Sequence, residues 1–124
     1  MTGKFVIRDT KGGIKFGLRA GNNQVVLTSD VYSSIAACRK GIESIRSNAP
    51  AAAVEDQTVL GFATEKNPKF EIYLDKSGGY RFRLKSKNGQ TVGTSEVYKA
   101  KPSCKNGIES VKKNAPDAVV IEEK

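Results

Sequence analysis

An internal repeat is the feature that most constrains the fold of this 124-residue chain. Shifting the sequence by 66 positions brings identical residues into line: Cys38 with Cys104, 41–44 with 107–110, and 48–50 with 114–116. Upstream of Asp9 the offset becomes 65, because Leu74 has no counterpart. Identities in one order over the whole length indicate a duplication. We therefore expect a first repeat in 1–56, a linker over 57–68 and a second repeat in 69–124, together forming one compact domain.

Each repeat has the pattern of three strands, a helix and a fourth strand. In the second repeat, apolar residues alternate with polar ones over 69–75 and again, after a Gly-Gly turn, over 80–85, which is typical of half-buried strands. A third strand is expected over 90–94. Apolar residues then recur at helical spacing from Ala100 to Ala115, and a short apolar run follows the helix. The sequence therefore predicts an α+β fold of two β-β-β-α-β repeats.

The loop between the second and third strands of a repeat sets how these strands pair. A three-residue loop with Gly89 in the left-handed conformation pairs Leu84 with Val92 and Arg83 with Gly93. Because directly opposite residues share a face of the sheet, this register keeps the apolar residues together.

Three longer segments of the second repeat have a recognisable pattern: Gly-Tyr-Arg-Phe-Arg-Leu-Lys at 79–85, Thr-Ser-Glu-Val-Tyr at 94–98, and Asn-Gly-Ile-Glu-Ser-Val-Lys-Lys-Asn-Ala-Pro at 106–116. With them the chain resembles the YegP-like family of small, often tandem, bacterial and archaeal domains that have no assigned function. The resemblance covers nearly the whole chain outside the linker. It implies two units that share one continuous, largely antiparallel sheet, with both helices on one face and the last strands exchanged between the units. It implies no catalytic residues.

A shared sheet is physically reasonable for units of this size. A unit of about 55 residues buries too little surface to be comfortably stable alone. Exchanging an edge strand enlarges the core and removes exposed strand edges. Because the repeat pair takes the place of a dimer, we expect the chain to be a monomer.

The residue inventory narrows the chemistry further. The chain has no His and two Cys, which excludes a Ser-His-Asp triad, a Cys-His pair, an imidazole metal ligand and a Cys-only zinc site. The paired glycines at 12–13 and 78–79 lack the strand–loop–helix context of a phosphate-binding loop. We therefore expect no catalytic residue, no cofactor and no metal site.

Three residue pairs are kept at equivalent positions of the two expected helices: Glu43 and Glu109, Cys38 and Cys104, and Gly41 and Gly107. The glutamates have two readings, an acid/base pair across the pseudo-twofold axis or a solvated helix face, and we favour the second. The cysteines either form a redox pair or disulfide or are buried reduced thiols, and again we favour the second. The glycines indicate a close approach of helix to sheet.

The net charge of +8 includes a group of cations on one face of the second repeat. Arg81, Arg83 and Lys85 lie on the strand face opposite the apolar one, Tyr73 lies on the same side, and Lys87 follows in the loop. A basic sheet face with an aromatic residue resembles a platform for single-stranded nucleic acid. These residues have two readings, a nucleic-acid or other polyanion site or an ordinary solvated basic face, and we favour the second because such platforms usually present two or three stacking aromatics and one is visible here.

The first repeat differs on the corresponding face. Strict alternation places Val6, Val25 and Leu27 there, as an exposed apolar patch that indicates a protein partner or self-association. The best interpretation is thus a binding or interaction module with an unknown ligand, and polyanion binding by the second repeat is the alternative.

No stretch of the sequence has the apolar length of a signal peptide or a membrane span. The low cysteine content suits a reducing compartment. We therefore expect a cytoplasmic protein without membrane contact.

Overall fold

The computed structural model describes residues 3–123 of the chain. The first repeat contains β1 (Lys4–Thr10), β2 (Gly13–Arg19), β3 (Val25–Thr28), α1 (Ile35–Asn48) and β4 (Ala53–Asp56). The second repeat contains β5 (Lys69–Leu74), β6 (Tyr80–Lys85), β7 (Thr91–Thr94), α2 (Lys101–Asn114), the short 3₁₀ helix η1 (Ala115–Asp117) and β8 (Val119–Glu123). Each repeat therefore has the β-β-β-α-β order that its hydrophobic pattern predicts.

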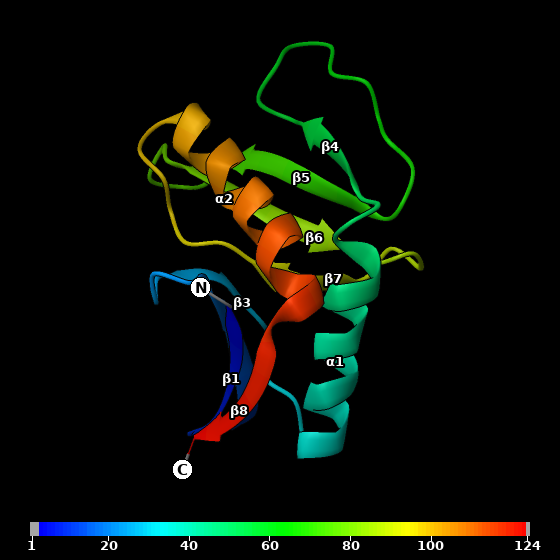
Figure 1. The fold of residues 1–124 in the computed structure, drawn as a ribbon. Coiled ribbons are helices and arrows are strands. Elements are labelled where there is room, and N and C mark those ends of the chain that lie inside the picture. Colours follow the sequence, from blue (N-terminus) through cyan, green and yellow to red (C-terminus); the bar gives the residue numbers. More distant parts are fainter. Residues whose placement is uncertain (1–2, 124) are drawn as a thin grey trace.

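All eight strands form one sheet in the order β4-β5-β6-β7-β3-β2-β1-β8. The last strand of each repeat pairs in parallel with the first strand of the other repeat, whereas the remaining neighbours are antiparallel. The two repeats meet at the centre of the sheet, where Thr28 of β3 lies opposite Thr94 of β7. The exchange of C-terminal strands implied by the family resemblance is thus confirmed (Figure 1).

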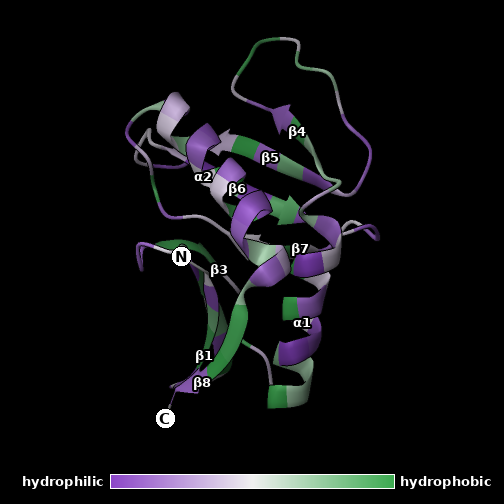
Figure 2. Ribbon diagram, viewed as in Figure 1, coloured by the Kyte–Doolittle hydropathy of each residue, from purple (hydrophilic) through white to green (hydrophobic). Residues whose placement is uncertain are grey.

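One hydrophobic core lies between the sheet and the two helices, which both cover the same face (Figure 1). Phenylalanine pairs on neighbouring strands anchor it: Phe5 meets Phe16 edge to face at 5.7 Å, and Phe70 meets Phe82 in the same way at 5.7 Å. The outward surfaces of the helices are mainly hydrophilic (Figure 2). The opposite face of the sheet, which no helix covers, is called the open face below.

The pairing predicted for β6 and β7 is wrong by one residue beyond the loop. The loop is as expected, with Gly89 at a φ of 83° and Lys85 opposite Thr91. A β-bulge then inserts Val92, so that Leu84 pairs with Gly93 instead of with Val92. A bulge adds a residue to one strand and exchanges the faces of the residues after it, which simple alternation does not reveal.

The equivalent bulge in β3 overturns part of the predicted apolar patch. Arg19 pairs with Val25, whereas Leu18 pairs with Leu27, so Val25 and Leu27 point to opposite faces. Leu27 has an exposed fraction of 0% and belongs to the core. Its side chain packs on Gly93 of the other repeat, where a Cβ would lie 2.7 Å from Leu27 Cγ. Leu27 is therefore a core residue at the junction of the repeats and no part of a contact patch.

The glycines inside the helices mark the predicted close approach. A Cβ on Gly107 would collide with the Tyr98 hydroxyl and lie 2.9 Å from Phe82 Cε2. Gly41 meets Tyr32 and Phe16 in the same way. In each repeat the tyrosine ring stacks on the phenylalanine of the second strand, with centroids 6.4 Å and 6.2 Å apart. These stacked rings leave no room for a side chain on the helix, which explains the glycine.

Candidate functional site

The basic residues predicted for the open face of the second repeat are brought together there, but carboxylates neutralise two of them. Arg83 Nε donates to Glu71 Oε1 at 2.5 Å, and the Arg83 guanidinium lies 4.3 Å from the centre of the Tyr73 ring. Arg81 Nε lies 3.5 Å from Asp75 Oδ2. Burial raises the pKa of Glu71, but the hydrogen bonds from Arg83 and Lys69 outweigh burial and lower it. The aromatic ring predicted to serve as a platform on this face, Tyr73, is therefore covered by Arg83.

A buried ionic network extends this pairing to the edge of the sheet. Lys69 Nζ lies 2.8 Å from Glu55 Oε1 and 3.2 Å from Glu71 Oε2. The Glu55 carboxylate, with an exposed fraction of 2%, also accepts from Gln57 Nε2 at 2.6 Å and from the backbone N–H of Glu65 at 2.8 Å. These hydrogen bonds from Gln57 and Glu65 hold the 57–68 segment over this side of the open face. Burial raises the pKa of Glu55, but these hydrogen bonds lower it from 4.5 to about 2.

Sequence reasoning missed Glu55 and Lys69, although the repeat contains the signal that finds Glu55. The counterpart of Glu55 in the second repeat is Ile121, so a carboxylate stands where the other copy has an apolar residue. Because the two copies share one fold, this difference indicates that the side chains around position 55 differ from those around position 121.

The lowered pKa of Glu55 makes the free energy of unfolding depend on pH in the acidic range. Because the pKa of Glu55 is lower in the folded chain than in the unfolded chain, its contribution is complete above about pH 4.5 and is lost as the pH falls toward 2. We expect the free energy of unfolding of wild type to exceed that of Glu55→Gln by up to about 3 kcal/mol at pH 7. Urea titrations between pH 7 and pH 2 should show this difference shrinking, and a constant difference would contradict the ionic role of Glu55.

The open face of the first repeat has a different composition at the same positions. Val6 replaces Glu71, Gly17 replaces Arg83, and Ile121 replaces Glu55. The register places these three replacements in one row, because Val6 lies opposite both Gly17 and Ile121. No segment equivalent to 57–68 fastens over this row in residues 3–123.

These replacements leave a groove in the open face of the first repeat. The groove has a volume of about 400 Å³, and Val6, Gly17 and Val25 form its apolar part. Three cations, Lys15, Arg19 and Arg8, and one carboxylate, Asp9, line its sides. Within the described part of the chain, ion pairing is found for Arg8, which lies 2.9 Å from Glu123, and not for Lys15 or Arg19.

The predicted apolar patch is therefore partly present. Val6 and Val25 lie on the open face, with Val25 36% exposed, whereas Val6 is buried between its neighbours and Leu27 is in the core. Ile121, at 40% exposed, belongs to the same face and was missed. Only the strand exchange brings β8 beside β1, so no pattern within the first repeat indicates it.

The residues weighed for catalysis lie apart or buried. Cys38 and Cys104 are fully buried free thiols, and burial raises the pKa of Cys104 to about 11, away from the range of a reactive thiolate. Glu43 pairs with Arg46 at 3.7 Å, and no described cavity is lined by both Glu43 and Glu109. Within residues 3–123, no three acidic or cysteine side chains gather as a metal site would require. No helix in this range is long and apolar enough to cross a membrane.

The chain is similar over nearly its whole length to proteins without an assigned function. The DUF1508 family, described as a domain of unknown function, matches residues 9–56 and 75–122. The "UPF0339 protein in ptx operon 5′ region" of Stutzerimonas stutzeri is 39% identical over 123 residues, which cover 98% of this chain and 97% of that protein. A UPF0339 protein of Treponema denticola is 59% identical over 54 residues, which cover 44% of this chain and 93% of that protein.

Two solved structures share the fold. The solution structure of the protein of unknown function yegP from E. coli aligns with a TM-score of 0.80 and 31% identity, covering 99% of this chain and 94% of that one. A UPF0339 protein of Shewanella oneidensis aligns with a TM-score of 0.79 and 28% identity, covering 98% and 92%.

Proposed function

The chain belongs to the DUF1508 family and carries two copies of its domain, and from this premise we propose that it is a non-enzymatic binding module whose contact surface is the open face of the first repeat. The resemblance to the YegP-like family is confirmed by the same comparisons. The observation that carries the proposal is the contrast between the two open faces. In the second face Arg81 and Arg83 pair with carboxylates and residues 57–68 are hydrogen-bonded to Glu55, whereas the first face has an apolar groove flanked by Lys15 and Arg19, for which residues 3–123 show no ion pair.

The groove suits one kind of occupant, an acidic and apolar segment of a partner protein. Val25 and Ile121 offer exposed apolar surface, and Lys15 and Arg19 offer positive charge on either side of Gly17. A partner segment that alternates apolar and acidic residues would place its apolar side chains against Val25 and Ile121. Its carboxylates would form ion pairs with Lys15 and Arg19. The exchange of strands within one chain supports a monomeric module, because the second repeat supplies the pairing that a dimer would otherwise provide.

Polyanion binding through the open face of the second repeat has less support. Its Arg81 and Arg83 face Asp75 and Glu71, and the Tyr73 ring carries Arg83 on its face. A nucleic-acid strand would have to break these contacts before it could stack or form ion pairs there.

Site-specific photo-crosslinking tests the proposed surface. A photoreactive residue at position 25 is expected to capture one protein from cell extract, with the crosslinked peptide acidic and apolar. The same residue at position 91, the equivalent position of the second repeat, should capture nothing specific. Adducts of equal yield and identity from both positions would overturn the proposal.

Charge reversal supplies the second arm of this experiment. The variant Lys15→Glu/Arg19→Glu is expected to reduce the specific adduct about tenfold or more, because both cations face the groove. The variant Lys76→Glu/Lys99→Glu changes the net charge equally in the second repeat and should leave the adduct intact. If both variants lose the adduct equally, the attraction is general and no groove contact is involved.

A further inference from the structure

A cleft lies between α1 and the β6–β7 loop, away from both open faces. Its volume is about 410 Å³, within the range of small-ligand sites. Its two walls come from different repeats and are fastened together, because the Lys87 backbone N–H donates to Asn48 Oδ1 at 3.1 Å. The Asn48 side chain is itself held in place, because its Nδ2 donates a hydrogen bond to the Ser44 carbonyl at 2.7 Å. The walls are therefore positioned before any ligand arrives.

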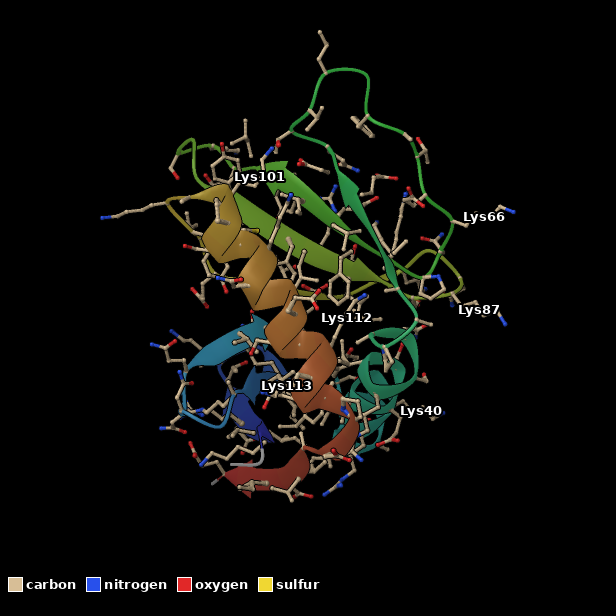
Figure 3. The ribbon with its side chains drawn as sticks, turned by 45° about the horizontal axis from the view of Figure 1, so that its top comes forward. Lys40, Lys66, Lys87, Lys101, Lys112 and Lys113 are labelled. Carbon is tan, nitrogen blue, oxygen red and sulfur yellow. The ribbon has the colours of Figure 1, made fainter. Side chains whose placement is uncertain are left out.

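The charged side chains that line this cleft are both cations, and they stand among neutral polar residues and the apolar Ala37 and Val92. Lys40 comes from α1 and Lys87 from the loop, and both project on the same side of the molecule (Figure 3). The hydroxyls of Tyr32 and Ser44 and the amide of Gln90 also line the cleft, and no carboxylate does so. Two ammonium groups beside neutral donors complement the oxygens of a phosphoryl group.

The duplication supplies an internal comparison for this cleft. The equivalent cleft, between α2 and the β2–β3 loop, has a volume of about 520 Å³ and keeps the same structural residues, with Asn114 in place of Asn48 and Ser110 in place of Ser44. The cations differ, because Asn106 replaces Lys40 and Gly21 replaces Lys87. Glu109 and Lys113 line this second cleft instead. The shared fold thus explains the cleft itself, whereas the paired lysines are particular to one copy.

We propose that the cleft between α1 and the β6–β7 loop binds a phosphate-bearing ligand, with one phosphoryl group held between Lys40 and Lys87. Of the basic residues singled out from the sequence, only Lys87 belongs to it. The 57–68 segment adjoins the loop, since a Cβ on Gly89 would lie 3.3 Å from Asn67 Nδ2, and Lys66 projects on the same side as Lys87 (Figure 3). A ligand with several phosphates can therefore extend from the cleft toward Lys66.

An NMR titration of the full chain tests the site. The probes are inorganic pyrophosphate, adenosine monophosphate and a single-stranded oligothymidine, each at low salt. We expect backbone amide shifts to concentrate at Ser44, Lys87 and Asn88, and not at Asn22 or Asn106 of the equivalent cleft. Tight binding of the two small probes identifies a phosphorylated small molecule as the source, whereas tighter oligothymidine binding that also shifts Lys66 identifies a nucleic-acid strand. Shifts that spread equally over both clefts, or no shifts with any probe at millimolar concentration, would overturn the proposal.

Substitution by the residues of the other repeat gives matched variants. Lys40→Asn and Lys87→Gly reproduce the equivalent cleft, and each is expected to weaken binding about tenfold by removing one charge-assisted contact. Lys99→Asn and Lys105→Asn remove the same charge elsewhere and should change the affinity less than about twofold. Equal losses in all four variants would show binding by net charge alone and refute a site. The variant Lys15→Glu/Arg19→Glu should retain the same localised shifts, so failure of this proposal is distinguishable from failure of the protein-contact surface.

Discussion

Replacing Lys69 with methionine is expected to destabilise the protein by about 3 kcal/mol, because a buried carboxylate then loses its cation. Lys69 Nζ lies 2.8 Å from Glu55 Oε1 and 3.2 Å from Glu71 Oε2. Glu71 retains Arg83, but Glu55 keeps only neutral donors at its buried position. Urea denaturation at pH 7 measures the loss as a change in the free energy of unfolding.

The first repeat provides the control for this substitution. Lys4 is the counterpart of Lys69 and lies opposite Arg19 and Val119. Val6 and Ile121 stand in place of Glu71 and Glu55, so neither carboxylate of the network has a counterpart beside Lys4. Lys4→Met should therefore change the free energy of unfolding by less than about 0.5 kcal/mol. If Lys4→Met and Lys69→Met cost the same, the buried network does not stabilise the fold.

A double variant distinguishes the effect of the unpaired carboxylate from the effect of lost packing at position 69. Lys69→Met/Glu55→Ile removes both charges and places at position 55 the residue that the other copy carries there. Because replacing a buried ion pair with packed apolar residues is often neutral, we expect it to recover most of the stability lost in Lys69→Met. A double variant no more stable than Lys69→Met would show that packing of the lysine stem, rather than the unpaired carboxylate, causes the loss.

Substitutions at Gly93 are expected to have the second large effect, because this residue receives a side chain from the other repeat. A Cβ there would lie 2.7 Å from Leu27 Cγ and Cδ2, and Leu27 is enclosed by the core. Gly93→Leu should destabilise the protein by about 3 kcal/mol through overpacking. Thermal or urea denaturation measures the loss, and Gly17→Ala is the control, since its Cβ meets no atom nearer than 3.6 Å.

Exchanging the two residues tests the contact directly. Leu27→Gly alone leaves a cavity and should cost about 4 kcal/mol or more. Leu27→Gly/Gly93→Leu moves the same side chain across the pseudo-twofold axis between equivalent positions of the two repeats. We expect the double variant to be more stable than either single variant, with a coupling energy of about 3 kcal/mol. Additive losses would show that the two positions are independent.

The Leu27–Gly93 contact also shows what a duplicated chain permits. At the centre of the sheet the equivalent positions face each other, so a symmetric dimer of identical repeats would carry the same residue twice. In one chain the two positions are free to become one large and one small residue, which interlock. The asymmetry of the open faces and of the two clefts has the same origin.

Much of the fold was predictable from the sequence because its signals are local. The alternation in 69–75 and 80–85 and the helical spacing from Ala100 to Ala115 depend on a single element each, and the strands and helix appear where these patterns place them. The bulge at Val92 was not predictable in this way, because one inserted residue leaves no mark on composition and moves every later partner. For the same reason the pattern placed Leu27 on the wrong face of the sheet.

The sequence by itself determined the duplication, the order of strands and helix in each repeat, and the side chains that form the core, with the exception of Leu27. Tertiary structure alone decided that Arg83 is neutralised by Glu71, that Glu55 is buried under the chain from residue 57 onward, and that Lys40 and Lys87 share a cleft. Periodicity reports which neighbouring side chains share a face of one element. Charge pairing, burial of a polar group and the walls of a cleft depend on residues distant in the sequence, whose meeting is set only when both repeats pack into one sheet.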